Sequence, residues 1–198
     1  MSRMNELYKK MIAFDKGDAK RIQHFTKVHN FARLIGQEEH LDEKTQYILE
    51  AAALVHDIGI RPAMEKYGNC NGKLQEQEGP AYAEEMLKGL GFAPDVIERV
   101  AYLVGHHHTY TDIDGLDYQI LDYQILVEAD FLVNYFEDGL DEESIKASVK
   151  KIFRTETGKT IARDMFYPEE FQMSETWAQD GLQDLEDWIE EQGIYIRQ

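Results

Sequence analysis

A histidine and an aspartate stand side by side at the end of an apolar helical run, and this pair could form half of a metal site. The run covers residues 51–55 and is followed by His56, Asp57, Ile58 and Gly59. Neighbouring helical residues diverge by about 100°, so both side chains reach one ion only near the helix end, where the helix dipole favours a cation. Gly59 is predicted to end this helix in the left-handed conformation. The alternative is a buried histidine that only caps its own helix.

Two further groups have the surroundings of inward-facing ligands. His24 lies four residues before Val28 on the apolar side of a predicted helix, whereas His29 lies off that side. Asp130 is framed by apolar residues in the stretch 126–133. A buried aspartate is rarely left unpaired, so it needs a cation, a metal ion or hydrogen-bond donors. We therefore predict that His24 and Asp130 come inward together with the His-Asp pair, from three helices.

The order of these residues resembles the HD-domain superfamily of metal-dependent phosphohydrolases, whose pattern is His, then His-Asp, then Asp. The similarity extends over about residues 20–165 and includes the spacing from His24 to Val28, the small residues before His56 and the stretch 128–132. It implies an all-α, single-domain helical bundle that hydrolyses a nucleotide or another small phosphate ester through a metal-activated water. The ligands that it implies are His24, His56, Asp57 and Asp130.

Family members with a binuclear centre carry two additional histidines, and this chain departs from that pattern at one of them. A His-Gly-Pro helix start is replaced here by Glu78-Gly79-Pro80, and a carboxylate ligand shifts preference toward oxygen-loving metals. The other place holds a run of three histidines, of which His106 and His107 are the expected ligands and His108 is a third candidate. The alternative for this run is a solvated loop. A second ion is therefore an open question, and nothing in the sequence separates Mn, Mg, Co, Fe, Ni and Zn.

Few basic residues stand where they could hold phosphate oxygens. Lys27 lies three residues after His24, near its face of the helix, and Arg61 follows the His-Asp pair. We predict that both contact phosphate or offset developing charge, and that Asp57 takes part in catalysis as well as in ligation. Arg99 is a further candidate, and the alternative for each base is an ordinary surface charge.

The elements that must position these groups are predicted to be helices. Apolar residues recur every three or four positions, and convincing alternation is hard to find, so one all-α domain over residues 1–198 is expected. Residues 60–76 are predicted to form a loop, with Pro80 in the first turn of the next helix. The predicted helices cover about residues 5–13, 18–36, 42–57, 78–90, 94–108, 123–136, 141–153, 159–166 and 175–191.

A repeated segment and the C-terminal stretch complicate this predicted arrangement of helices. The segment Asp117–Leu121 is repeated at once as Asp122–Leu126. Five residues are not a whole number of helical turns, so the first copy is predicted to be an insertion that lengthens the preceding loop. The C-terminal stretch 166–198 contains an amphipathic helix whose apolar stripe packs either on its own domain or on a second copy in a homodimer.

The composition of the chain restricts the classes of binding partner that we expect. The formal net charge is −17, with 38 acidic and 21 basic residues, so we expect neither a nucleic acid polymer nor an anionic membrane as a partner. A small phosphorylated substrate such as a nucleotide is the expected partner, and divalent ions would supply the missing positive charge. The single cysteine, Cys70, excludes an internal disulfide and favours the cytoplasm, as does the lack of a signal-like or membrane-spanning apolar run.

Two other functions are open from the sequence. The site could hold two irons that activate O₂ on a small polyol or phosphonate, which oxygen-dependent turnover would reveal. The chain could also be a non-catalytic module that senses a metal or a nucleotide, although its intact ligand residues argue against this.

Overall fold

The protein is all-α in a computed structural model that describes residues 2–109 and 121–168. Within those ranges the regular structure is entirely helical, which confirms the predicted fold class. Met1–Tyr167 form one compact unit. The predicted helix over 175–191 and most of the first repeat copy lie outside the described residues, so a single domain over 1–198 stays a prediction. The helices are α1 (Arg3–Phe14), α2 (Ala19–Glu38), α3 (Glu43–Val55), the 3₁₀ helix η1 (His56–Gly59), α4 (Ile60–Tyr67), α5 (Gly72–Gly89), α6 (Pro94–Val104), α7 (Asp122–Glu137), α8 (Glu142–Ile152) and α9 (Glu156–Phe166).

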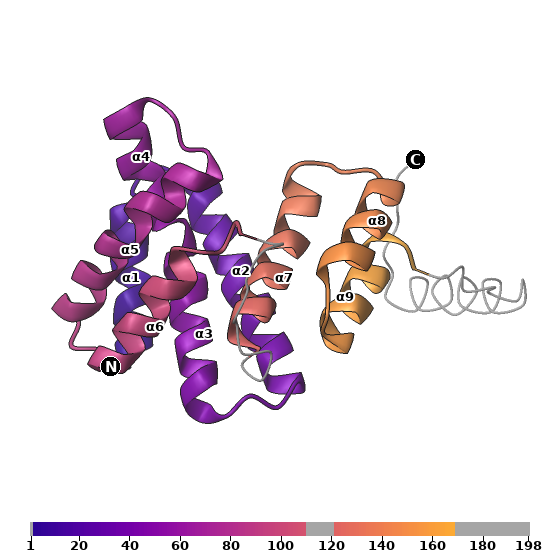
Figure 1. The fold of residues 1–198 in the computed structure, drawn as a ribbon, viewed down its shortest axis with the longest axis horizontal. Helices are drawn as coiled ribbons and strands as arrows, with labels where there is room; N and C mark the ends of the chain where they lie inside the picture. Colours follow the sequence, from indigo (N-terminus) through magenta and orange to yellow (C-terminus); the bar gives the residue numbers. More distant parts are fainter. Residues whose placement is uncertain (1, 110–120, 169–198) are drawn as a thin grey trace, which may run out of the picture. The chain divides into compact units, whose positions relative to one another are not determined.

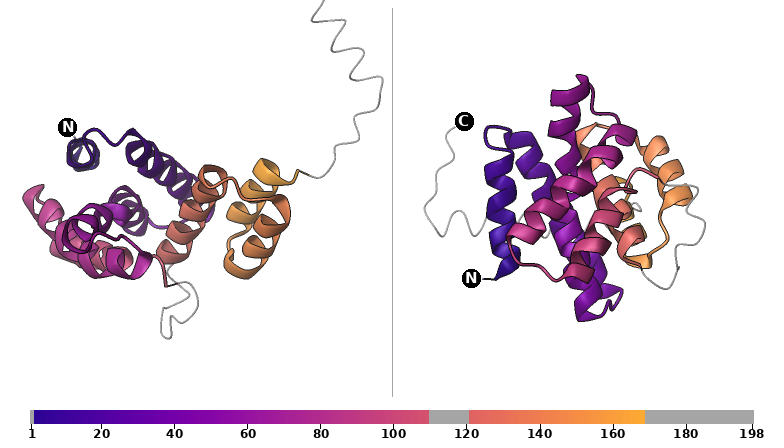
Figure 2. Two further views of the ribbon diagram at one scale, coloured as in Figure 1. Left: turned by 90° about the horizontal axis from the view of Figure 1, so that it is seen from above. Right: turned by 60° about the vertical axis from the view of Figure 1, so that its left-hand side comes forward.

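Helix α3 is the centre of the unit and packs against α1, α2, α6 and α7 (Figure 1). Its last five residues, 51–55, are fully buried, and three of them are alanines that let neighbouring helices approach closely. Helix α7 lies between α2 and α3 on one side and the pair α8–α9 on the other (Figures 1 and 2). Despite this burial, none of the helices in the described ranges combines the length and hydrophobicity that spanning a membrane requires.

Capping side chains set several helix starts where they were predicted. The carboxylate of Asp18 accepts a hydrogen bond from the backbone N–H of Arg21, and that of Asp141 accepts one from Ser144. Asp42 accepts two, from Lys44 and Thr45. Each carboxylate accepts from amide groups that have no partner within the first turn of the helix. Its negative charge also interacts favourably with the positive end of the helix dipole.

The segment after the His-Asp pair was predicted wrongly in two respects. Residues 60–67 form helix α4 rather than a loop, and Gly68 ends that helix in the left-handed conformation at φ 65°. Helix α5 begins at Gly72, after the cap Asn71, so Pro80 lies inside the helix instead of in its first turn. Proline inside a helix costs a hydrogen bond, and here packing of α5 on η1 and α6 outweighs that cost.

Candidate metal centre

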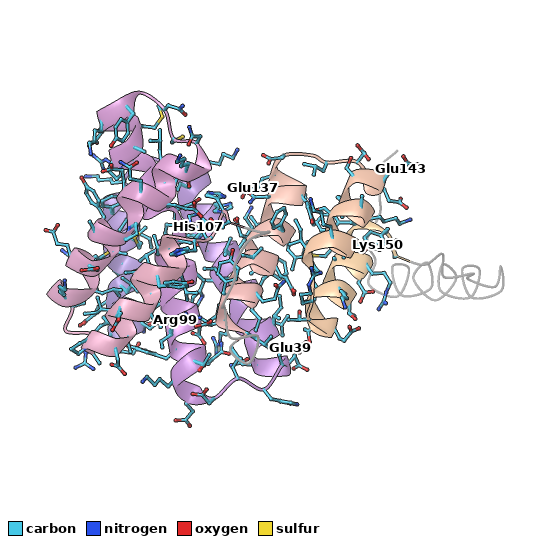
Figure 3. The ribbon with its side chains drawn as sticks, viewed as in Figure 1. Glu39, Arg99, His107, Glu137, Glu143 and Lys150 are labelled. Atoms are coloured by element: carbon cyan, nitrogen blue, oxygen red, sulfur yellow. The ribbon has the colours of Figure 1, made fainter. Side chains whose placement is uncertain are left out.

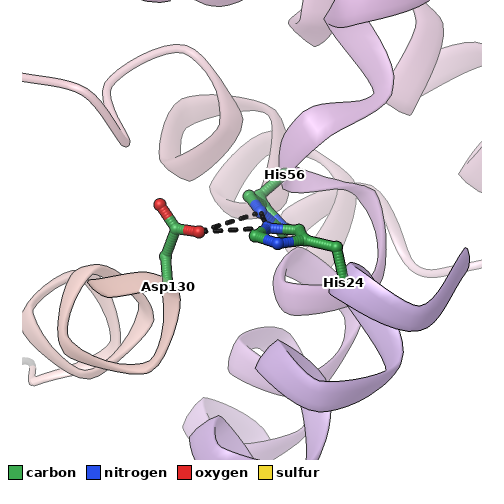
Figure 4. Close-up of side chains that lie close together, drawn as sticks. All are labelled: His24, His56 and Asp130. Carbon is green, nitrogen blue, oxygen red and sulfur yellow. Dashed lines mark hydrogen bonds and ion pairs between the residues drawn. The ribbon is translucent and has the colours of Figure 1, made fainter. Parts of the chain in front are cut away.

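Four donor groups from three segments converge inside the bundle, and three of them are drawn in Figure 4. His24 comes from α2, His56 and Asp57 from η1, and Asp130 from α7. Nε2 of His24 lies 3.2 Å from Nε2 of His56, 3.1 Å from Oδ1 of Asp130 and 3.5 Å from Oδ2 of Asp57. Nε2 of His56 lies 3.6 Å from each of the same two carboxylate oxygens. The structure thus brings together the four residues that were predicted as ligands.

These separations suit ligands around a single ion. Nitrogen and oxygen ligands bind zinc at about 2.0–2.2 Å, and four atoms in a tetrahedron of that radius lie about 3.3–3.6 Å apart. The five separations given above, which all involve an imidazole nitrogen, run from 3.1 to 3.6 Å. Unprotonated imidazole nitrogens and carboxylate oxygens only accept hydrogen bonds, so a proton or a cation must lie between them. The donor set therefore fits a divalent ion.

The turn at η1 is what delivers two adjacent ligands to one place. The tighter 3₁₀ winding follows the end of α3, and Nδ1 of His56 donates to the carbonyl of Ala53 at 2.9 Å. Gly59 was predicted to stop the chain in the left-handed conformation, and this is wrong, because its φ of −71° is right-handed and α4 follows directly. Glycine is required for another reason: a Cβ atom at residue 59 would lie 2.4 Å from the carbonyl oxygen of Gln75.

A second donor group adjoins the first and shares Asp57. One oxygen or nitrogen atom of each of Asp57, His107 and His108 lies within 4.8 Å of the others. Oδ2 of Asp57 faces the first group, while its Oδ1 lies 3.6 Å from Nε2 of His107. That nitrogen is buried and has no hydrogen-bond partner among the described residues. Asp57 could thus offer one carboxylate oxygen to each group, and the unpartnered nitrogen of His107 would suit a ligand to a second ion.

Burial and mutual contacts shift the pKa values of the clustered carboxylates and imidazoles in opposite directions. Burial would raise the pKa of the Asp57 and Asp130 carboxyls, but the neighbouring imidazoles outweigh it and hold both pKa values well below the usual range. Burial lowers the pKa of His56, yet these carboxylates outweigh it in turn and raise the pKa to about 9. Burial and the neighbouring His107 lower the pKa of His108 to about 4, so its ring is neutral at pH 7. Both carboxylates are therefore ionised. The positive charge that stabilises them here comes from the imidazoles, and a bound divalent ion would supply it instead.

Two predicted ligands of the second ion lie elsewhere. Oε1 of Glu78 accepts hydrogen bonds from Lys66 and Tyr67, at 3.0 and 2.7 Å, and Glu78 belongs to neither donor group. The ring of His106 stacks on Tyr102 at 4.1 Å and lines a groove of about 740 Å³ between α5 and α6. Successive residues after α6 point in different directions, and that divergence turns His107 inward and His106 outward.

The predicted phosphate-binding residues are paired with acids in this structure. Nζ of Lys27 lies 2.6 Å from Oε1 of Glu137. Arg61 is exposed and contacts Glu65 at 3.0 Å and the carbonyl of Phe14 at 2.6 Å. Arg99 forms a bidentate pair with the buried Asp122, with bonds of 2.9 and 2.7 Å that link α6 to the start of α7. Arg99 thus has a structural partner, while phosphate binding by Lys27 and Arg61 stays a prediction.

Two residues that surround the ligands were missed by sequence reasoning. Nδ2 of Asn134 donates to Oδ1 of Asp130 at 3.0 Å, and Oε2 of Glu137 lies 3.2 Å from Nδ1 of His24. Both follow Asp130 on α7, at four and seven residues, so they share its face of the helix. That spacing was visible in the sequence, but polar side chains at a helix end are ordinary there. Metal ligands are commonly oriented by such hydrogen bonds.

Comparisons with known proteins identify a family. The HD domain family model matches residues 21–155, which includes all four residues of the first donor group together with His107 and His108. A comparison with curated proteins finds no match, and a comparison with solved structures finds none either. The family assignment therefore depends on the sequence pattern that the family model describes, and the geometry above agrees with it.

Proposed function

The chain belongs to the HD domain family, and on that premise we propose that it is a metal-dependent phosphohydrolase acting on a nucleotide or another small phosphate ester. The observation that carries the proposal is the first donor group, in which two imidazoles and two carboxylates lie at ligand spacing. A bound divalent ion supplies a water whose pKa falls from about 15.7 toward 7, and it neutralises phosphate charge.

The chain's own residues supply the surroundings for this chemistry. His24, His56 and Asp130 are buried, with at most 6% of each residue exposed, so they hold an ion away from bulk solvent. The side chain of Asp57 is 16% exposed, which makes it the ligand of this group that a substrate or a water can reach most easily. Because its carboxyl is ionised, it can accept a hydrogen bond from an attacking water.

Positive charge for the phosphate comes mainly from metal ions in this proposal. The chain is strongly acidic, and Lys27 and Arg61 are each paired with a glutamate. A phosphate group would have to compete with those carboxylates for each base. We therefore expect Lys27→Ala and Arg61→Ala to raise the KM more than they lower kcat, in contrast to changes of the ligands.

The test uses purified full-length protein with Mn²⁺, Co²⁺ or Mg²⁺ and a panel of nucleotides and simple phosphate esters. We expect release of phosphate that His56→Ala and Asp57→Ala abolish. His29→Gln is the matched control, because His29 is a histidine of α2 that faces Glu50 at 3.4 Å and belongs to neither donor group. Full activity of the His56 and Asp57 variants would refute the proposal.

The same preparations separate the two alternatives. Turnover that requires O₂ and bound iron would replace hydrolysis by oxygenation, and the residues that would hold two irons are the two donor groups, with Asp57 near both. Stabilisation by a nucleotide without turnover under any metal would indicate a sensor. Phosphate release with no oxygen dependence supports the hydrolase.

A further inference from the structure

We propose that Glu137 is a positioning residue of the metal centre, whose carboxylate holds the His24 ring so that Nε2 faces the ion. This inference rests on the proposed metal-binding role of the first donor group. Glu137 is the last residue of α7, and its side chain is 10% exposed. In Figure 3 it lies at the end of α7, and its Oε2 is 3.2 Å from Nδ1 of His24.

The three imidazoles that face the site through Nε2 are held in the same way. Nδ1 of His56 donates to the carbonyl of Ala53 at 2.9 Å, and Nδ1 of His107 donates to that of Val104 at 2.7 Å. In each case the hydrogen bond from Nδ1 fixes the ring so that Nε2 faces the site, and Nε2 is the atom that can bind an ion once it carries no proton. His24 has the same arrangement, but its acceptor is the Glu137 carboxylate.

The position of each histidine explains this difference. Ala53 and Val104 lie in the last turns of α3 and α6, where carbonyl groups have no partner within the helix. His24 lies inside α2, where the carbonyls of the preceding turn already accept helical hydrogen bonds. An acceptor for its Nδ1–H must therefore come from another element, and α7 provides it.

Lys27 fixes the other oxygen of the same carboxylate. Its Nζ lies 2.6 Å from Oε1 of Glu137, so each oxygen of the carboxylate has a different partner. The two carboxylate oxygens thus accept from two different neighbours at once. An amide in the same place has a single acceptor oxygen and could not do so.

Glu137→Gln tests the inference because an amide has one acceptor oxygen. The charged Lys27 takes that oxygen, which turns the amide NH₂ toward Nδ1 of His24 and moves the ring proton to Nε2, where it opposes metal binding. We expect the dissociation constant for Mn²⁺ to rise about 10–100-fold. In the double variant Lys27→Met, Glu137→Gln the amide is free to turn its oxygen to His24, so part of the affinity should return.

The measurements are Mn²⁺ affinity by titration calorimetry, the His24 tautomer by ¹⁵N NMR of the metal-free protein at a pH where the ring is neutral, and thermal unfolding of the metal-free form. Glu50→Gln is the matched control, since Glu50 lies 3.4 Å from Nε2 of His29, a histidine outside the donor groups. It should leave the Mn²⁺ affinity within about twofold of wild type.

The outcomes distinguish this inference from the proposed function. Wild-type affinity and an unchanged His24 tautomer in Glu137→Gln would overturn the positioning role while leaving the metal centre intact. Loss of thermal stability alone would also overturn it, because it would indicate a purely structural contact. A wild-type protein that binds no divalent ion would instead refute the metal centre itself.

Discussion

Raising the pH from 7 to 9 should lower the stability of the metal-free protein and should strengthen its binding of a divalent ion. In the metal-free protein, burial lowers the pKa of His56, but the carboxylates of Asp57 and Asp130 outweigh it and raise the pKa to about 9. An unfolded chain has a histidine pKa of about 6.5. Burial lowers the pKa of His24, but the hydrogen bond to Asp130 and the charges of Asp57 and Asp130 together outweigh it, so this pKa is raised as well.

The size of the effect on stability follows from this difference. A group whose pKa is raised by folding adds stability that is complete below the unfolded pKa and is lost as the pH rises through the folded pKa. For His56, which is fully buried, about 2.5 pKa units correspond to about 3 kcal/mol, lost mainly between about pH 6.5 and 9. In a chain of this size that loss lowers the Tm by about 6–12 °C.

Metal affinity should move the other way. An ion binds only the deprotonated His56, so proton competition weakens the apparent affinity about 100-fold at pH 7 and about tenfold at pH 8. The dissociation constant for Mn²⁺ should therefore fall about tenfold between pH 7 and 8 and about fivefold between pH 8 and 9, with release of about one proton from His56 at pH 7. Calorimetry in two buffers of different ionisation enthalpy counts that proton, and thermal unfolding with and without Mn²⁺ gives the two stability profiles.

Either profile can refute the reasoning. Metal-free stability that is flat or rises between pH 6.5 and 9 would mean that the carboxylates do not hold a proton on His56. An Mn²⁺ affinity that is independent of pH would mean that His56 is not a ligand. His56→Gln should remove most of both dependences, whereas His29→Gln should keep them.

Three further predictions concern the scaffold around the site. Glu128 is fully buried and accepts hydrogen bonds from the backbone N–H groups of Arg154 and Thr155 and from the Thr155 hydroxyl. Because Glu128→Ala leaves these buried donors without an acceptor, it should lower the free energy of unfolding in urea by about 2–4 kcal/mol. Gly59→Ala should lower it by about 1–3 kcal/mol and weaken Mn²⁺ binding, because the new Cβ meets the backbone of α5; unchanged binding would contradict that close packing. Burial raises the pKa of Asp15 to about 6, so the folded protein favours the protonated carboxyl and loses stability as the pH rises through 6. Asp15→Asn should therefore raise the free energy of unfolding in urea by about 1–3 kcal/mol at pH 8 but not at pH 4.

Much of the fold was predictable because its signals are local. The capping carboxylates of Asp18, Asp42 and Asp141 and the three-to-four spacing of apolar residues depend only on neighbours within two turns of helix. The same locality made His24 and Asp130 recognisable, since each stands on the apolar face of its own helix. The prediction was wrong where a local signal competed with packing. Pro80 indicated a helix start near residue 78, yet α5, which packs on η1, begins at Gly72.

The surroundings of the site depended on tertiary structure. The sequence does not distinguish the three consecutive histidines, because the path of the chain after α6 sets which ring turns inward. In the structure His107 rather than His106 faces Asp57. Glu78, Lys27 and Arg99 carried suitable charges, but residues distant in the sequence pair with them. The orienting role proposed for Glu137 depends on an acceptor 113 positions away from His24. The sequence by itself therefore determined which helices carry the ligands, whereas the directions and partners of the charged side chains were decided only when the helices packed, because those contacts join residues that are remote along the chain.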